Sequence, residues 1–221
     1  MFNVKRDVPT PESLKSAGKN YNNPDVLEAL NKIFHSKCYI CEIKEPTSIA
    51  VEHFNADNPN RTDWENLYFA CTRCNSNLKG NRYNNLLDPA DPETDVFRLV
   101  HHRAPSTPNT EITISKATDT PDSKEISETL ELINLAFNDA STGNRSVSRS
   151  FLRKKVFKVL AKVSREIEKW CDEDTPRHKK KEAEQQIIHF LRVDQEFSAF
   201  IRWLILDDLE LQPVFGHYIE D

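Results

Sequence analysis

The sequence predicts an α+β fold in which a small region of strands and short helices, built around a four-cysteine metal site, precedes a mostly α-helical C-terminal region. Two observations support this fold class. Two Cys-x-x-Cys pairs enclose a strand-like segment in the first half of the chain. Apolar residues then recur at helical spacing through the last third. We therefore expect a motif-bearing domain over residues 1–90, a loop-rich linker over 91–124 and a helical region over 125–221.

The composition is that of a globular protein, with 38% hydrophobic and 29% charged residues. No apolar run reaches the ~18 residues of a membrane span, and the first residues lead into no apolar signal segment. These features predict a cytoplasmic protein that does not associate with a membrane. The net charge of −5 argues against a nucleic-acid partner. Residues 145–169, however, hold nine basic and two acidic side chains, and such a local excess attracts phosphate.

The chain before the first cysteine pair predicts an irregular lead-in over residues 1–22 and a short helix over 24–34. Asn23 suits the N-cap of that helix and Pro24 its first position. Its apolar residues at helical spacing are Val26, Leu27, Leu30 and Phe34.

The two cysteine pairs predict a structural zinc site. Cys38 with Cys41, and Cys71 with Cys74, have the spacing that lets four thiolates surround one tetrahedral Zn²⁺. In a chain without a secretory signal, paired cysteines favour metal over disulfides; free buried cysteines or a redox dithiol are the weaker alternatives. Four protein ligands leave no open position, so this zinc is expected to stabilise the fold and not to catalyse. Cys171 is expected to be a bystander.

The segment between the pairs carries the polar chemistry. Residues 49–54 predict a strand that delivers Glu52 and His53. A neutral imidazole can take a proton from water near pH 7. Neighbouring residues on a strand point to opposite faces, so the strand end must bend if both are to serve one site. The basic residues Arg73, Lys79 and Arg82 flank this segment and could hold phosphates, although a solvated surface charge explains each of them equally well.

Taken in order, the first cysteine pair, Glu52-His53, Asn66-Leu67, the second pair with Asn75 directly after it, and Lys79 resemble the HNH, or ββα-metal, endonuclease family. The resemblance covers about a fifth of the chain. It implies metal-dependent hydrolysis of phosphodiester bonds on a ββα-metal core, with His53 as the general base.

The same resemblance implies that Glu52 and Asn75 bind the catalytic divalent ion. Two oxygen ligands with several waters suit Mg²⁺ or Mn²⁺. Asn66 would pin the loop that carries His53, because an amide both donates and accepts hydrogen bonds. Many members of the family have Asp in place of Glu52 and His in place of Asn75. Glu is longer than Asp, so the resemblance does not fix the geometry of the metal site.

After the motif, residues 81–125 are rich in Pro, Asp and Thr and predict a linker or covering loop, with a short strand over 111–114. His101 and His102 fall in this segment, where solvated side chains are expected in preference to a second metal site. A helix is expected over 125–138, and residues 141–144 end it.

Two long helices are expected to follow, over 146–170 and roughly 176–206, forming a hairpin that packs on the motif region or on a partner. The first is strongly basic, and Lys154, Lys155 and Lys158 could steer phosphate. An ordinary solvated face is an equally good explanation. The apolar stretch 197–206 must be buried, at the edge of a helical core or at a partner interface.

Further features resemble one branch of the HNH family. They are the segment from Phe34 to Lys37, Cys41-Glu42, residues 51–54, Leu87-Asp88-Pro89, and residues 132–135 followed by an Arg-rich helix. Together they are similar to PtuB, the nuclease subunits of Septu anti-phage systems, whose relatives also occur in retron operons. The resemblance implies an ATPase partner of the PtuA type and an antiviral role.

Two readings from other classes stay open. One is a free-standing restriction-type or homing-type HNH nuclease that uses the helices as its own DNA-binding region. The other is a catalytically inactive zinc-knuckle module that only binds nucleic acid. DNA is favoured over RNA as the substrate, since HNH sites mostly cut DNA.

Overall fold

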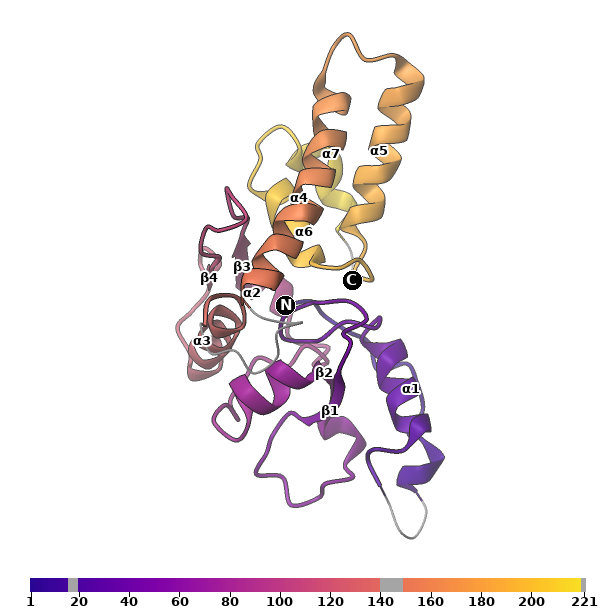
Figure 1. The fold of residues 1–221 in the computed structure, drawn as a ribbon, viewed down its shortest axis with the longest axis vertical. Coiled ribbons are helices and arrows are strands. Elements are labelled where there is room, and N and C mark those ends of the chain that lie inside the picture. Colours follow the sequence, from indigo (N-terminus) through magenta and orange to yellow (C-terminus); the bar gives the residue numbers. More distant parts are fainter. Residues whose placement is uncertain (16–19, 140–148, 220–221) are drawn as a thin grey trace.

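The computed structural model describes residues 1–15, 20–139 and 149–219. It confirms the α+β class: helices pack against two small antiparallel sheets (Figure 1). A single cluster of buried hydrophobic residues contains members from all three expected regions, such as Leu30, Val100 and Phe200. Residues of all three regions thus contribute to one cluster.

The first helix, α1 (Pro24–Ile33), ends one residue earlier than expected. Asn23 has the extended backbone of an N-cap, and Pro24 occupies the first turn. The buried face of α1 packs against β2. A short 3₁₀ turn, η1 (Glu12–Leu14), precedes it, and Ser13 Oγ donates to Asp25 Oδ1 at 2.7 Å.

The motif region is built on two antiparallel strands, β1 (Ile49–His53) and β2 (Leu67–Cys71). Glu52 lies opposite Tyr68, and His53 opposite Leu67. A 3₁₀ turn, η2 (Trp64–Asn66), leads into β2, and a wide helical segment, η3 (Arg73–Lys79), follows it. Every residue of β2 is buried, so this strand forms the centre of the region.

The segment expected to be a loop-rich linker contains regular structure. It holds α2 (Val96–Leu99) and an antiparallel pair, β3 (Val100–Arg103) with β4 (Thr113–Lys116). β4 lies two residues later than the expected strand. β3 was not expected, because its sequence shows no apolar alternation. Tertiary contacts explain it: Trp203 Nε1 donates to the Val100 carbonyl at 2.9 Å. His102, expected to be solvated, is buried within β3.

The C-terminal part is helical, as expected. Its helices are α3 (Lys124–Asn138), α4 (Arg149–Cys171), α5 (Arg177–Leu191), α6 (Ser198–Leu206), α7 (Gln212–Phe215) and the 3₁₀ turn η5 (Gly216–Tyr218). α4 and α5 form the expected hairpin, which projects away from β1 along the long axis (Figure 1). The expected break at 141–144 and the expected start of α4 at 146 lie outside the described residues.

The single helix expected over 176–206 is two helices. α5 ends at Leu191, and α6 begins after Phe197, whose φ of 56° lies in the left-handed region. This turn folds α6 back into the core, where Phe200 and Ile201 are fully buried. The chain itself therefore covers one side of the apolar stretch, whereas Trp203, Leu204 and Leu206 are only half-buried.

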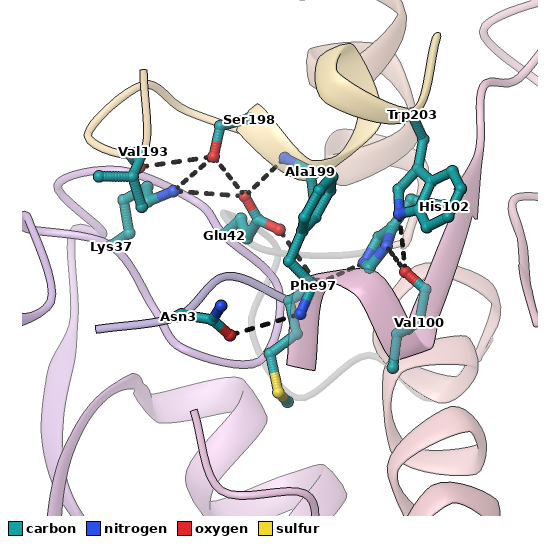
Figure 2. Close-up of polar contacts among 11 residues, drawn as sticks. Asn3, Lys37, Glu42, Phe97, Val100, His102, Val193, Ser198, Ala199 and Trp203 are labelled. Atoms are coloured by element: carbon teal, nitrogen blue, oxygen red, sulfur yellow. Dashed lines mark hydrogen bonds and ion pairs between the residues drawn. The ribbon is translucent and has the colours of Figure 1, made fainter. Parts of the chain in front are cut away.

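A buried polar network joins the motif region to α6 (Figure 2). The Glu42 carboxylate accepts from Lys37 Nζ, Ser198 Oγ and the Ala199 amide, each at 3.3 Å. The Met1 ammonium lies 3.2 Å from the same carboxylate. Burial alone would raise the pKa of Glu42, but Lys37 and the ammonium hold it well below its usual range.

Candidate metal centre and catalytic pocket

The four cysteines expected to bind zinc come together. Their Sγ atoms all lie within 4.8 Å of one another, and all four side chains are buried. Cys41 Sγ and Cys71 Sγ are 3.9 Å apart, close to the roughly 3.8 Å edge of a tetrahedron with Zn–S bonds of ~2.3 Å. This cluster could hold a metal ion such as zinc.

Local structure explains how the cluster forms. Cys38 and Cys41 lie in a tight turn after α1, closed by a hydrogen bond from the Cys38 amide to the Ile43 carbonyl at 3.0 Å. Cys71 ends β2, and Cys74 lies in the first turn of η3. The two pairs are distant in sequence, and the packing of α1 against β2 brings them together.

Glu52, His53 and Asn75 line one pocket of about 160 Å³. Tyr21 and Arg61 also line it. Asn75 reaches the pocket from η3, so β1 and η3 both supply part of the lining. The two neighbours Glu52 and His53 thus contribute to one site at the end of β1.

Glu52 is 3% exposed, and its Oε1 lies 2.9 Å from Lys79 Nζ. Its Oε2 is buried and has no hydrogen-bond partner among the described residues. Burial raises the pKa of Glu52 to about 7, because desolvation outweighs the opposing effect of Lys79. A carboxylate oxygen that has no other partner can serve as a ligand to a divalent ion.

His53 makes two contacts with one residue. Its Nε2 donates to the Arg61 carbonyl at 2.9 Å, and its Nδ1 accepts from the Arg61 guanidinium at 2.9 Å. A carbonyl only accepts and a guanidinium only donates, so a neutral ring with its proton on Nε2 satisfies both. Burial lowers the pKa of His53, although the hydrogen bond to the Arg61 carbonyl opposes this effect in part. The lowered pKa favours the neutral ring that a general base requires.

Asn66 ties the two ends of the loop after β1. Its Oδ1 accepts from the Asn55 amide at 2.7 Å, and its Nδ2 donates to the Asn55 carbonyl at 3.0 Å. Asn84 makes a similar contact, accepting from the Ala56 amide at 2.9 Å. These bonds hold the backbone next to His53.

Two residues expected to hold phosphate are placed differently. Arg73 is 1% exposed and donates to the Ala136 carbonyl in α3 at 2.7 Å. Lys79 is fully buried between Glu52 and the His53 carbonyl, to which its Nζ donates at 3.0 Å. Neither side chain reaches solvent in this arrangement, so Arg73 supports the core and Lys79 supports Glu52 and His53 from behind the pocket.

The other basic residues expected to hold phosphate lie nearer the surface. Arg82 is exposed, and its guanidinium donates to the carbonyls of Asn77 and Leu78. On α4, Lys154 and Lys158 are exposed, whereas Lys155 pairs with Glu196 at 2.6 Å.

The pocket also contains residues that the sequence analysis missed. Arg61 contacts both nitrogens of His53, and the Tyr21 ring meets the His53 ring edge-on, with centroids 4.6 Å apart. Arg61 lies in a polar loop, and nothing in its sequence context separates it from its neighbours. Tyr21 comes from the lead-in before α1, which only tertiary folding brings to the site.

No family model, curated protein or solved structure matches this chain. Among the described residues, no helix is long and apolar enough to cross a bilayer.

Proposed function

We propose that this protein is a metal-dependent endonuclease of the HNH type, which hydrolyses phosphodiester bonds in nucleic acid, with DNA favoured. The observation that carries the proposal is the convergence of Glu52, His53 and Asn75 on one small polar pocket. The order of β1, β2 and η3, with these residues at the end of the first strand and in the helical segment, supports a ββα-metal core.

The donor set fits two kinds of ion. Four buried thiolates suit a structural Zn²⁺. The unpartnered Glu52 Oε2 and the Asn75 side chain would hold the catalytic ion, for which oxygen-rich ligation favours Mg²⁺ or Mn²⁺. Such an ion, when bound, neutralises charge on the phosphate and on the leaving oxygen.

The chain's own residues supply the proton chemistry and the positioning. His53 takes one proton from the attacking water, whose oxygen bonds to phosphorus while the bond from phosphorus to the leaving oxygen breaks. The leaving oxygen then takes a proton from solvent. Lys79 holds both the Glu52 carboxylate and the His53 carbonyl, and Asn66 fixes the following loop. Glu52 and His53 are thereby held in one orientation before substrate arrives.

The biological setting we propose is that of a PtuB-like nuclease effector in anti-phage defence, acting with an ATPase partner of the PtuA type. Sequence resemblance alone supports this part. A free-standing nuclease differs in cutting efficiently without a partner, and an ATPase gene beside this one would favour the complex. The intact Glu52, His53 and Asn75 argue against a module that only binds.

The proposal is tested with purified protein, alone and with the neighbouring ATPase, on plasmid DNA and on RNA. We expect cleavage with Mg²⁺ or Mn²⁺, and its loss in EDTA before zinc is released. His53→Ala should lower the rate by about 10²–10⁴-fold, because it removes the base, while the protein stays folded and keeps its zinc. Cleavage by His53→Ala at the wild-type rate, or no cleavage by the wild type in any of these mixtures, would refute the proposal.

A further inference from the structure

The contact between Arg61 and His53 has two separable parts. The backbone carbonyl of Arg61 accepts from Nε2, and its guanidinium donates to Nδ1, each at 2.9 Å. The carbonyl fixes the ring and sets its tautomer. The guanidinium covers the nitrogen lone pair that remains.

That lone pair is the one a general base needs. With the proton on Nε2, only Nδ1 can take a proton from water. In the described arrangement the Arg61 guanidinium occupies this position. His53 is therefore oriented for catalysis and capped at the same time.

The Arg61 guanidinium can move away without displacing the His53 ring. Its side chain is exposed, and besides His53 its guanidinium contacts the Ala56 carbonyl at a long 3.4 Å. Its backbone belongs to a loop held at Asn55 by Asn66 and at Ala56 by Asn84. The guanidinium can leave Nδ1 while the carbonyl stays on Nε2.

A phosphodiester in the pocket is the ligand that would draw the guanidinium away. Arg61 lines the same pocket as Glu52 and Asn75, and Arg binds phosphate through two parallel charge-assisted hydrogen bonds. A neutral imidazole nitrogen offers one acceptor and no charge. The exchange from Nδ1 to a phosphate is therefore favourable.

We propose that Arg61 is the phosphate-binding residue of the pocket and that it caps His53 Nδ1 until a phosphodiester takes the guanidinium away. The nuclease base is thus uncovered by its own substrate. This inference rests on the proposed function, since it assumes that a phosphodiester enters the pocket.

The test uses Arg61→Ala and Arg61→Lys, with Arg103→Ala as the control, because Arg103 is an exposed arginine of β3 outside the pocket. The probe is a short single-stranded DNA oligonucleotide without added divalent ion. Its binding is measured by fluorescence anisotropy. The state of His53 is followed by the ¹⁵N resonances of the ring at a fixed pH above the usual imidazole range.

We expect Arg61→Ala to shift the His53 Nδ1 resonance in the free protein. The oligonucleotide should shift the wild-type Nδ1 resonance in the same direction and leave that of Arg61→Ala nearly unchanged. Arg61→Ala should bind the oligonucleotide about tenfold or more weakly, because charged hydrogen bonds are lost. Arg61→Lys should fall between them, since it keeps the charge without the planar fork. Arg103→Ala should match the wild type.

Two results would overturn the inference, and they differ in meaning. If the wild type binds and cuts DNA but Arg61→Ala binds it equally well, or leaves Nδ1 unmoved, only the role of Arg61 is wrong. If the wild type neither binds the oligonucleotide nor cuts DNA with Mg²⁺ or Mn²⁺, the proposed function fails as well. Zinc content and thermal melting of each variant show that a weaker binder is still folded.

Discussion

At the scale of single residues, the pocket depends on the buried pair of Glu52 and Lys79. The two charged atoms are 2.9 Å apart, and neither side chain is more than 3% exposed. Because removing one member of such a pair leaves the other charge without compensation, the pair is sensitive to single substitutions.

Lys79→Met tests this dependence. At a pH well above 7, where Glu52 is ionised, it should lower the free energy of unfolding by about 3–5 kcal/mol, measured by urea denaturation without added divalent ion, because the Glu52 carboxylate would stay buried without its ammonium partner. The double variant Glu52→Gln with Lys79→Met should recover part of the loss. A single variant as stable as the wild type would show that the pair does not support the fold.

Glu52 also predicts a pH dependence of stability. Its pKa rises from the usual 4.5 to about 7 in the folded protein, so the folded state holds a proton that the unfolded state releases between these values. Without divalent ion, the contribution of Glu52 is therefore fully present below pH 4.5 and lost as pH rises through about 7. The loss is at most about 3 kcal/mol.

The measurement compares urea unfolding of the wild type and Glu52→Gln on both sides of this window. The difference between the two proteins should change across the window, because Gln cannot titrate. A constant difference would mean that Glu52 titrates normally.

The resemblance to the HNH motif predicted that Glu52, His53 and Asn75 serve one site, and these three residues line one pocket. It could not predict burial of charge. Arg and Lys are usually surface residues. Arg73 is buried because it bonds to α3, and Lys79 is buried because it pairs with Glu52. Arg61 was missed for the opposite reason, because its role depends on how one loop folds back on His53.

At the scale of elements, the cysteine cluster fastens the turn before β1 to the end of β2 and to η3. These segments are short, and metal ligation contributes directly to the folding free energy of such regions. We expect one zinc per chain by elemental analysis.

The chain offers a matched pair of variants for this prediction. Cys41 belongs to the buried cluster, whereas Cys171 is exposed at the end of α4. Cys41→Ser should lose zinc and give unfolded or insoluble protein, while Cys171→Ser should keep both zinc and fold. A stable wild-type protein that contains no zinc would contradict the assignment.

Elements with strong local signals were predicted within a few residues. α1 has its Asn-Pro start, and α3 has a clear apolar period. β3 and the break between α5 and α6 have no such signal. β3 is held by β4 and by Trp203, and the break depends on a left-handed Phe197 that periodicity cannot reveal.

At the scale of the whole molecule, α6 connects the two halves. Ser198 and the Ala199 amide bind Glu42 directly beside Cys41, while Trp203 contacts β3 (Figure 2). The helical part is therefore packed into the same core as the cysteine cluster. The α4–α5 hairpin is the part that projects from this core (Figure 1).

The positive charge on the projecting hairpin can be tested for a role in nucleic-acid binding. Lys154 and Lys158 of α4 are exposed, whereas Lys155 is paired with Glu196. If α4 steers nucleic acid, replacing all three with Gln should weaken DNA binding and flatten its salt dependence. Each lost phosphate contact lowers the slope of log affinity against log salt by about 0.7–0.9, so Lys154 and Lys158, which form no ion pair with any described residue, should together account for roughly 1.5.

The control replaces Lys15, Lys116 and Lys124, which pair with acids elsewhere on the surface, and it removes the same total charge. A general effect of net charge would change both triple variants alike, whereas steering by α4 would change only the first. DNA affinity is measured over a series of salt concentrations for all three proteins. An unchanged slope in the α4 variant would make this helix an ordinary solvated face and leave substrate binding to the pocket, its loop and any partner.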